Sequence, residues 1–168
     1  MNHTYNPTVV RTMQWNGAKM APEILLSREW IVTNGLGGYA SGTVSGAITR
    51  RYHGLLTAAL PAPLGRMVMW SHVSEVLRFG DSDVVSLGAE ERAGGQLDLK
   101  GADWLREFRL EDGLPVWTYH VRDLVLEKRV LLPHLQTPCM SVTAGWRGRR
   151  GRGWNSGLPF IFGIMKHR

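Results

Sequence analysis

The sequence has only one cysteine, Cys139, among its 168 residues. A single thiol excludes an intramolecular disulfide framework and a cysteine-rich zinc site. Histidine does not supply a metal site either, because His53, His72, His120 and His134 are scattered without the spacing of metal ligands. We therefore expect no metal and no cofactor, and the lone cysteine fits a reducing compartment.

Long apolar segments are also lacking. No run approaches the roughly 20 residues that a membrane-spanning helix needs. Residues 1–15 are polar and do not have the basic-then-apolar layout of a signal peptide. We expect a cytoplasmic protein that has no membrane partner.

Acidic residues are missing from the last 25 positions. Residues 144–168 carry six basic side chains and no carboxylate, whereas residues 1–143 balance 14 basic against 14 acidic side chains. The formal net charge of +6 therefore belongs entirely to the tail. A neutral body with a short basic tail is a weak signature of nucleic-acid binding, which usually needs a basic face on the folded domain.

Extended helical periodicity is absent as well, since no segment shows an apolar stripe over three helical turns. Short β-branched and aromatic runs instead end at Gly, Pro, Asn or Asp. The expected strands are Trp30 to Thr33, Tyr52 to Leu60, Arg66 to Phe79, Asp83 to Leu87, Trp104 to Leu110, Pro115 to Val121, Leu124 to Leu132 and Cys139 to Thr143. Glu111-Asp112-Gly113 predicts a hairpin turn. The pattern predicts an all-β, antiparallel β-sandwich.

Glycine is concentrated in one short segment. Five glycines fall within twelve residues, at Gly35, Gly37, Gly38, Gly42 and Gly46. A nucleotide-binding glycine loop needs a helix directly behind it, but the residues that follow here are β-branched and broken by further glycines. A structural turn between two strands is therefore favoured over a nucleotide site.

The segment Arg50-Arg51-Tyr52-His53 gathers two guanidinium groups, a phenol and an imidazole. On a strand, Arg50 and Tyr52 would share one face, while Arg51 and His53 would share the other. Guanidinium groups donate several fixed hydrogen bonds and suit a hydroxyl-rich ligand or a domain contact. The other interpretation is a solvated strand edge whose arginines pair with nearby carboxylates, and the residues alone favour neither.

The tryptophans and carboxylates do not mark a catalytic site. Trp30, Trp70, Trp104 and Trp117 lie in expected strands, where core packing is favoured over sugar stacking. A glycosidase needs two carboxyl groups across the scissile bond, and no such pair stands out. Five carboxylates lie in amphipathic, strand-like settings where we expect a solvated face: Glu75, Asp103, Glu107, Asp123 and Glu127.

The stretch from Arg28 to Gly46, followed by Thr49-Arg50-Arg51-Tyr52-His53-Gly54, resembles the N-terminal domain of bacterial and archaeal glycogen debranching enzymes of the amylo-α-1,6-glucosidase type. Pro115 to Tyr119 and Leu126 to Val130 also look like that family. The resemblance covers about Ser27 to Thr143.

The resemblance implies a β-sandwich of the supersandwich kind that packs against an (α/α)6 barrel, and the barrel holds the carboxylates that cleave α-1,6 branch linkages. It implies no catalytic residue in this chain. The residues expected to face the α-glucan or the barrel are the glycine-loop and arginine-segment residues Asn34, Gly35, Gly37, Gly38, Tyr39, Arg50, Arg51, Tyr52 and His53.

Three segments are expected: an irregular lead-in at residues 1–26, the debranching-enzyme domain at 27–143, incomplete at its C-terminus, and an irregular basic tail at 144–168. We interpret the abrupt change of composition as a frame change near Thr143 to Gly145, which would leave a truncated, inactive domain. Two alternatives stay open, a free-standing α-glucan-binding module and a basic nucleic-acid-binding protein. We favour the debranching-enzyme domain, with α-glucan or the barrel as partner and no nucleic acid.

Overall fold

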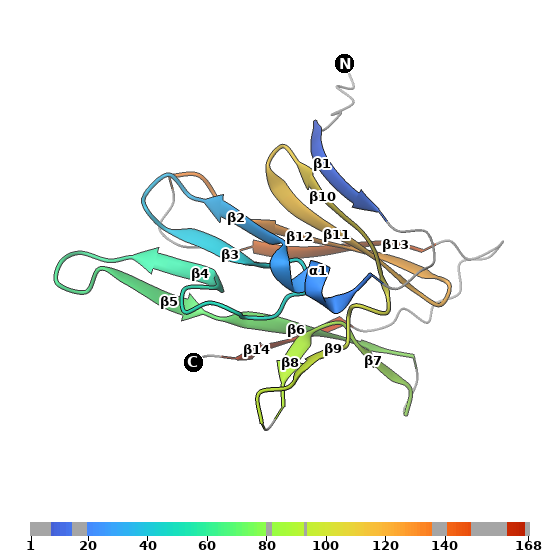
Figure 1. Cartoon of the computed structure of the whole chain (residues 1–168). Coiled ribbons are helices and arrows are strands. Elements are labelled where there is room, and N and C mark those ends of the chain that lie inside the picture. The colour runs from blue at the N-terminus through green and yellow to red at the C-terminus, as the bar shows by residue number, and fades with distance from the viewer. Residues whose placement is uncertain are drawn as a thin grey trace, which may run out of the picture.

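The computed structural model describes residues 8–14, 20–79, 82–92, 94–135, 141–148 and 161–166. Within these residues the protein consists of antiparallel sheets and one short helix (Figure 1). The predicted all-β sandwich is thereby confirmed. No helix in the described part of the chain is long and apolar enough to cross a membrane.

A five-stranded sheet forms one layer. Its strands lie in the order β1-β10-β11-β12-β13, with bounds Val9–Gln14, Leu105–Glu111, Leu114–Val121, Leu124–Leu131 and Ser141–Gly148. The predicted hairpin joins β10 to β11 through Asp112 and Gly113, and both residues have positive φ angles, 49° and 81°. A two-residue turn of this kind matches the right-handed twist of the strands that it connects.

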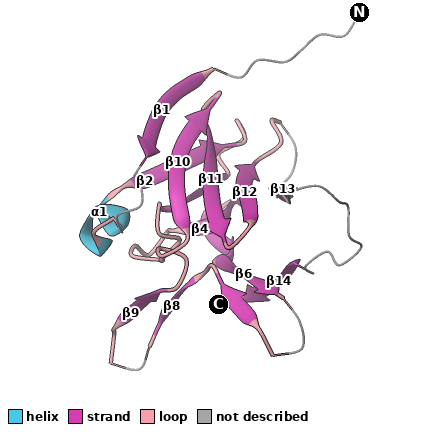
Figure 2. Cartoon of the chain, turned by 90° about the vertical axis from the view of Figure 1, so that its right-hand side faces the viewer, coloured by secondary structure: helices cyan, strands magenta, loops and turns pink. Residues whose placement is uncertain are grey.

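The opposite layer contains a four-stranded and a three-stranded sheet. The order β2-β3-β4-β5 holds the strands Glu29–Thr33, Tyr39–Thr43, Gly54–Ala59 and Arg66–Trp70. The order β14-β6-β7 holds Ile161–Lys166, His72–Arg78 and Val84–Ser86. A separate hairpin, β8 (Ala89–Glu91) with β9 (Leu97–Leu99), projects below the core, where it diverges from β6 (Figure 2).

Two tryptophans join the layers at the centre of the core. Trp30 of β2 and Trp117 of β11 meet edge to face, with ring centroids 5.3 Å apart. The indole of Trp117 donates to the Val44 carbonyl at 2.8 Å, and that of Trp30 donates to the Thr43 carbonyl at 3.2 Å. Both tryptophans are core residues, as predicted. Each buried aromatic side chain of this kind contributes about 2–3 kcal/mol to stability.

The lead-in is more ordered than its composition suggests. It holds β1, which pairs with β10, and helix α1 (Pro22–Ser27), which begins with a proline and carries the fully buried Leu25. Proline suits the first turn of a helix because the missing N–H would have no partner there. The expectation of an irregular segment at residues 1–26 is therefore wrong for these two elements.

Two further boundaries differ from expectation. The long strand predicted from Arg66 to Phe79 is interrupted at Ser71, so that β5 and β6 belong to different sheets. In the tail that we expected to be irregular, β13 continues through Gly148 and β14 pairs with β6. The Cys139 part of the last predicted strand lies outside the described residues.

Candidate functional site

The glycine loop is the turn of the β2–β3 hairpin, as the sequence favoured. The buried side-chain oxygen of Asn34 accepts hydrogen bonds from the Leu36 and Gly38 amides at 2.9 and 3.0 Å. The Asn34 amide donates to the Gly38 carbonyl at 3.1 Å. Gly35 and Gly37 adopt positive φ angles of 77° and 87°, which side chains disfavour. The hydrogen bonds of Asn34 therefore hold the loop backbone in its turn conformation.

The segment that follows β12 (residues 132–135) passes across this loop and fixes it. The Leu135 amide donates to the Asn34 carbonyl at 2.8 Å. A Cβ atom at Gly35 would stand 2.6 Å from His134 Cε1, closer than real Cβ contacts come. Gly35 thus serves both the backbone turn and the close approach of an imidazole. No pattern in the sequence connects His134 with the loop.

The Arg50-Arg51-Tyr52-His53 segment is a turn and not a strand. The His53 amide donates to the Arg50 carbonyl at 3.1 Å, and β4 begins only at Gly54. The predicted alternation of faces is therefore wrong. The turn holds Arg50 against Glu29, with Nε 2.6 Å from Oε1, buries His53 and leaves Arg51 and Tyr52 exposed. The pairing of Arg50 agrees with the interpretation in which an arginine meets a nearby carboxylate.

His53 is the buried titratable group of this turn, with 5% of its surface exposed. Its Nδ1 lies 3.4 Å from the Thr49 amide, which donates to it, and its Nε2 lies 3.8 Å from Glu29 Oε1. Burial lowers the pKa of His53 below its ordinary value, while Glu29 acts in the opposite direction and Arg50 adds to the lowering. A neutral imidazole is therefore favoured at this position.

An open hollow of about 700 Å³ lies on the outer surface of the β2–β3 hairpin. Its lining combines loop backbone with exposed or half-buried side chains, from Ile31, Thr33, Gly35, Gly37, Gly38, Tyr39, Tyr52 and Arg66. Five of the nine predicted site residues therefore meet here, namely Gly35, Gly37, Gly38, Tyr39 and Tyr52. Asn34 lies beneath the loop, and Arg50 and His53 face Glu29 instead.

Three residues of the hollow were missed from the sequence. Ile31 and Thr33 are the exposed positions of β2, whose alternating burial pattern could have indicated them. Arg66 comes from the start of β5, and its Nε donates to the Gly37 carbonyl at 3.2 Å. Nothing in the sequence pairs Arg66 with a loop 29 residues earlier.

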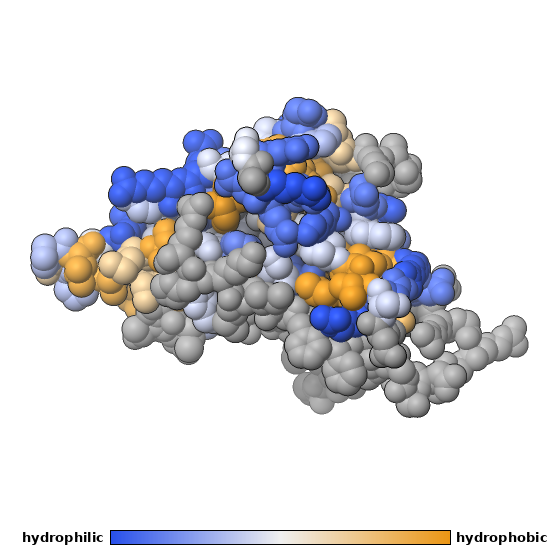
Figure 3. Space-filling model, turned by 90° about the horizontal axis from the view of Figure 1, so that it is seen from below, coloured by the Kyte–Doolittle hydropathy of each residue, from blue (hydrophilic) through white to orange (hydrophobic). Residues whose placement is uncertain are grey.

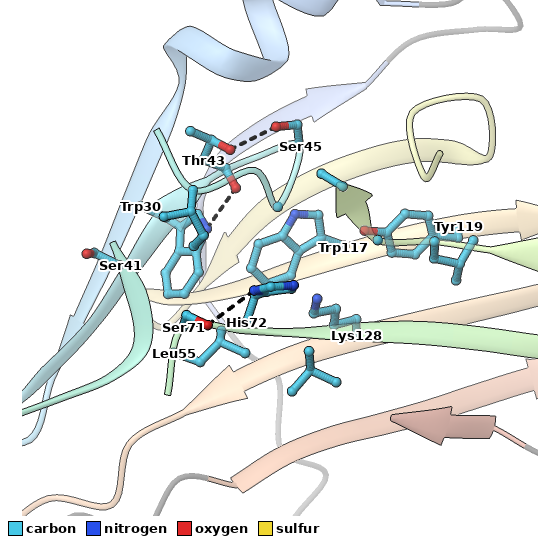
Figure 4. A pocket seen from close by; sticks show the side chains of 17 residues that line it. Trp30, Ser41, Thr43, Ser45, Leu55, Ser71, His72, Trp117, Tyr119 and Lys128 are labelled. Atoms are coloured by element: carbon cyan, nitrogen blue, oxygen red, sulfur yellow. Dashed lines mark hydrogen bonds between the residues drawn. The ribbon is translucent and has the colours of Figure 1, made fainter. Parts of the chain in front are cut away.

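A second, enclosed cavity lies between the layers and is much smaller, about 30 Å³ (Figure 4). Trp30, Trp117 and Tyr119 border it, and His72 meets Ser71 at 3.2 Å on its lower side in this view. A volume of this size holds about one water molecule and no sugar. The outer hollow is therefore the candidate site for a larger ligand.

Beside this cavity, a buried ion pair joins the two layers. Lys128 Nζ of β12 lies 2.6 Å from Glu75 Oε1 of β6, and the two side chains are only 11% and 5% exposed. Burial, together with the Glu75 charge, raises the pKa of Tyr119 well above its ordinary value. The solvated face expected for Glu75 is thus wrong, because the side chain points into the core toward Lys128.

Several other carboxylates are engaged with arginines. On the outer face of the five-stranded sheet, Arg109 contacts Glu107, Glu111 and Glu127 at 3.1, 2.6 and 2.8 Å, and Arg129 pairs with Glu111. Burial opposes the charged form of Glu127, but the hydrogen bonds from Arg109 and Arg129 lower its pKa below the ordinary value. Among the described residues, no Asp or Glu lines either the outer hollow or the small cavity.

The described residues contain no group of three His, Cys, Asp or Glu side chains that could hold a metal ion. Comparison with curated proteins and with solved structures gives no match. Comparison with family models gives a match to the family described as glycogen debranching enzyme N terminal, over residues 28–147. The matched stretch includes the glycine loop, the Arg50–His53 turn and all strands from β2 to β12. This chain belongs to the glycogen debranching enzyme N-terminal family.

Proposed function

We propose that the chain is a supporting domain of an enzyme that debranches glycogen, and that a separate catalytic unit supplies the hydrolytic groups. The family match over residues 28–147 is the observation that carries this proposal. The resemblance described above implies an (α/α)6 barrel as the catalytic unit. We place the protein in the cytoplasm, because its proposed role is glycogen breakdown and its single cysteine fits a reducing compartment.

The state of the carboxylates supports a non-hydrolytic role. Hydrolysis of a glycosidic bond uses two carboxyl groups about 5–9.5 Å apart, on either side of the bond, in a cleft that admits sugar. The described residues that line the hollow large enough for a sugar include no carboxylate. The cluster of Glu107, Glu111 and Glu127 is tied to Arg109, which leaves it poorly suited to proton transfer.

The tip of the β2–β3 hairpin is the surface that best fits a contact with the catalytic unit. Leu36 and Leu135 are 51% and 62% exposed there, although the Asn34 hydrogen bonds hold the backbone around them. The β4–β5 hairpin adds Leu64 and Met67, which are 61% and 44% exposed, and apolar colour marks the far end of that hairpin in Figure 3. Rigid, exposed apolar side chains of this kind are typical of interaction surfaces.

The test uses an intact enzyme in which this domain is joined to its catalytic unit. Leu36→Asp should reduce glucose release from α-1,6 stubs of a branched dextrin by about tenfold, the effect expected when one charge is placed in an apolar contact. Val84→Asp is the matched control, because Val84 is similarly exposed, 46%, and lies in β7 away from the hairpin.

Arg50→Ala adds an independent variant, because Arg50 is 69% exposed and belongs to the turn that precedes β4. We expect a smaller decrease in glucose release than for Leu36→Asp. Val84→Asp should leave activity at the level of the unmodified enzyme. If Leu36→Asp and Arg50→Ala do so too, this end of the domain does not support debranching.

A further inference from the structure

The hollow on the β2–β3 hairpin has the chemistry of a site for a hydroxyl-rich ligand. Its lining has two phenol rings, Tyr39 and Tyr52, one guanidinium group, Arg66, and the hydroxyl of Thr33. No carboxylate lines it in the part of the chain that the structure describes. Phenol rings give broad apolar contact with a polar tip, and guanidinium groups donate hydrogen bonds in fixed directions. Both features match a sugar, which has an apolar C–H face and a rim of hydroxyls.

The Tyr52 ring is exposed on a turn whose backbone is held in place. The side chain is 45% exposed, and the Arg51 guanidinium lies 5.3 Å from its ring centroid. The Ser41 hydroxyl of β3 donates to the Tyr52 carbonyl at 3.3 Å, which ties the turn to the hairpin. A ring presented from an ordered turn leaves only its side-chain rotations to be lost when a ligand stacks on it.

Arg66 is fixed over the glycine loop by its Nε hydrogen bond to the Gly37 carbonyl. That bond uses one N–H of the guanidinium group, so that the Nη groups remain for a ligand. Arg66 Nη2 lies 3.9 Å from the position that a Cβ of Gly37 would occupy. Because Gly37 has no side chain, the hollow stays open beside the Arg66 guanidinium.

We propose that this hollow binds a linear stretch of α-1,4-glucan, with a glucose ring stacked on Tyr52 and its hydroxyls bonded to Arg66 and Thr33. The choice of an α-glucan rests on the proposed function, whereas the polyhydroxylated character of the ligand rests on the lining. Such a site would hold an outer chain of the polymer while a branch point is cleaved elsewhere.

Isothermal titration of the full chain with maltoheptaose tests the site. We expect a dissociation constant of about 0.1–1 mM, typical of a shallow site with few contacts. Tyr52→Ala and Arg66→Ala should each weaken binding about tenfold. Tyr52→Phe should retain most of the affinity because it keeps the ring. Leu131→Ala is the control, since Leu131 is 41% exposed on β12 of the other layer.

Cellohexaose and inorganic phosphate are the matched probes for linkage and charge, and neither should compete with maltoheptaose. The inference is overturned if maltoheptaose does not bind up to about 10 mM, if it binds Tyr52→Ala and Arg66→Ala as tightly as the unmodified chain, or if phosphate displaces it. These outcomes are independent of the Leu36→Asp experiment, so the proposed function can stand while the glucan site fails.

Discussion

A single glycine determines how closely two segments approach at the hairpin tip. Gly35 combines a φ of +77° with a position only 2.6 Å from His134 Cε1 for any added Cβ. Gly35→Ala should therefore lower the free energy of unfolding by about 2–3 kcal/mol, of which about 1 kcal/mol is backbone strain. Urea unfolding measures the difference.

Gly113→Ala separates the two causes of this loss. Gly113 has nearly the same φ, +81°, but no heavy atom lies within 4 Å of its added Cβ, so we expect only the backbone part, about 1 kcal/mol. Adding His134→Ala to Gly35→Ala should recover the steric part. Equal losses for the two alanine variants would show that His134 does not press on the loop.

The buried imidazole of His53 makes stability depend on pH. Its pKa is lowered in the folded protein mainly by burial, so the unfolded chain binds a proton first as the pH falls below the ordinary value of 6.5. Stability should therefore be complete above that value and should decrease between it and the lower, folded-state pKa.

Thermal unfolding across this acidic range measures the slope for His53→Gln and for the unmodified chain. The stability of His53→Gln should decrease less steeply as the pH falls than that of the unmodified chain, whatever the absolute stability of the variant. His120→Gln is the matched substitution control, because His120 is an exposed histidine at the end of β11. Identical slopes for all three proteins would contradict a lowered pKa for His53.

At the scale of elements, the Lys128–Glu75 pair links strands β12 and β6 across the core. Lys128→Met would leave Glu75 buried without its cation and should lower the free energy of unfolding by about 3–5 kcal/mol. The double variant Glu75→Leu/Lys128→Met removes both charges and should recover most of the loss. A loss below about 1 kcal/mol in Lys128→Met would indicate that solvent reaches the pair as it does on a surface.

The elements most accurately predicted are those with a local signal. Alternating residues and Asp112-Gly113 identified the β10–β11 hairpin, and clustered glycines identified the β2–β3 turn. Helix α1 was missed because six residues are too few to show a helical period. The turn before β4 was read as strand because a hydrogen bond between Arg50 and His53, three residues apart, leaves no composition signal.

At the scale of the whole molecule, the candidate site likewise contains residues that the sequence predicts and residues that it does not. Residues close in sequence, Gly35 to Tyr39, were identified together, and Tyr52 was identified from its motif. The contacts of three groups depend on which strands become neighbours, and sequence spacing does not encode that pairing. These groups are Arg66, His134 and the Glu75–Lys128 pair. Lys128 shares a face of β12 with the buried Leu126 and Val130, so alternation alone could have placed it in the core.

At the scale of the whole molecule, the hollow and the apolar hairpin tip lie on the β2–β3 hairpin of one layer. In the other layer, the carboxylates Glu107, Glu111 and Glu127 are paired with Arg109. This arrangement suits a domain that holds glucan and contacts a catalytic unit. Glucose release from a branched dextrin with α-1,6 stubs, by the purified chain alone and by the enzyme with its catalytic unit, tests this division of labour most directly. We predict release by the intact enzyme only. Glucose release by the isolated chain that persists unchanged after further purification would contradict a non-hydrolytic domain.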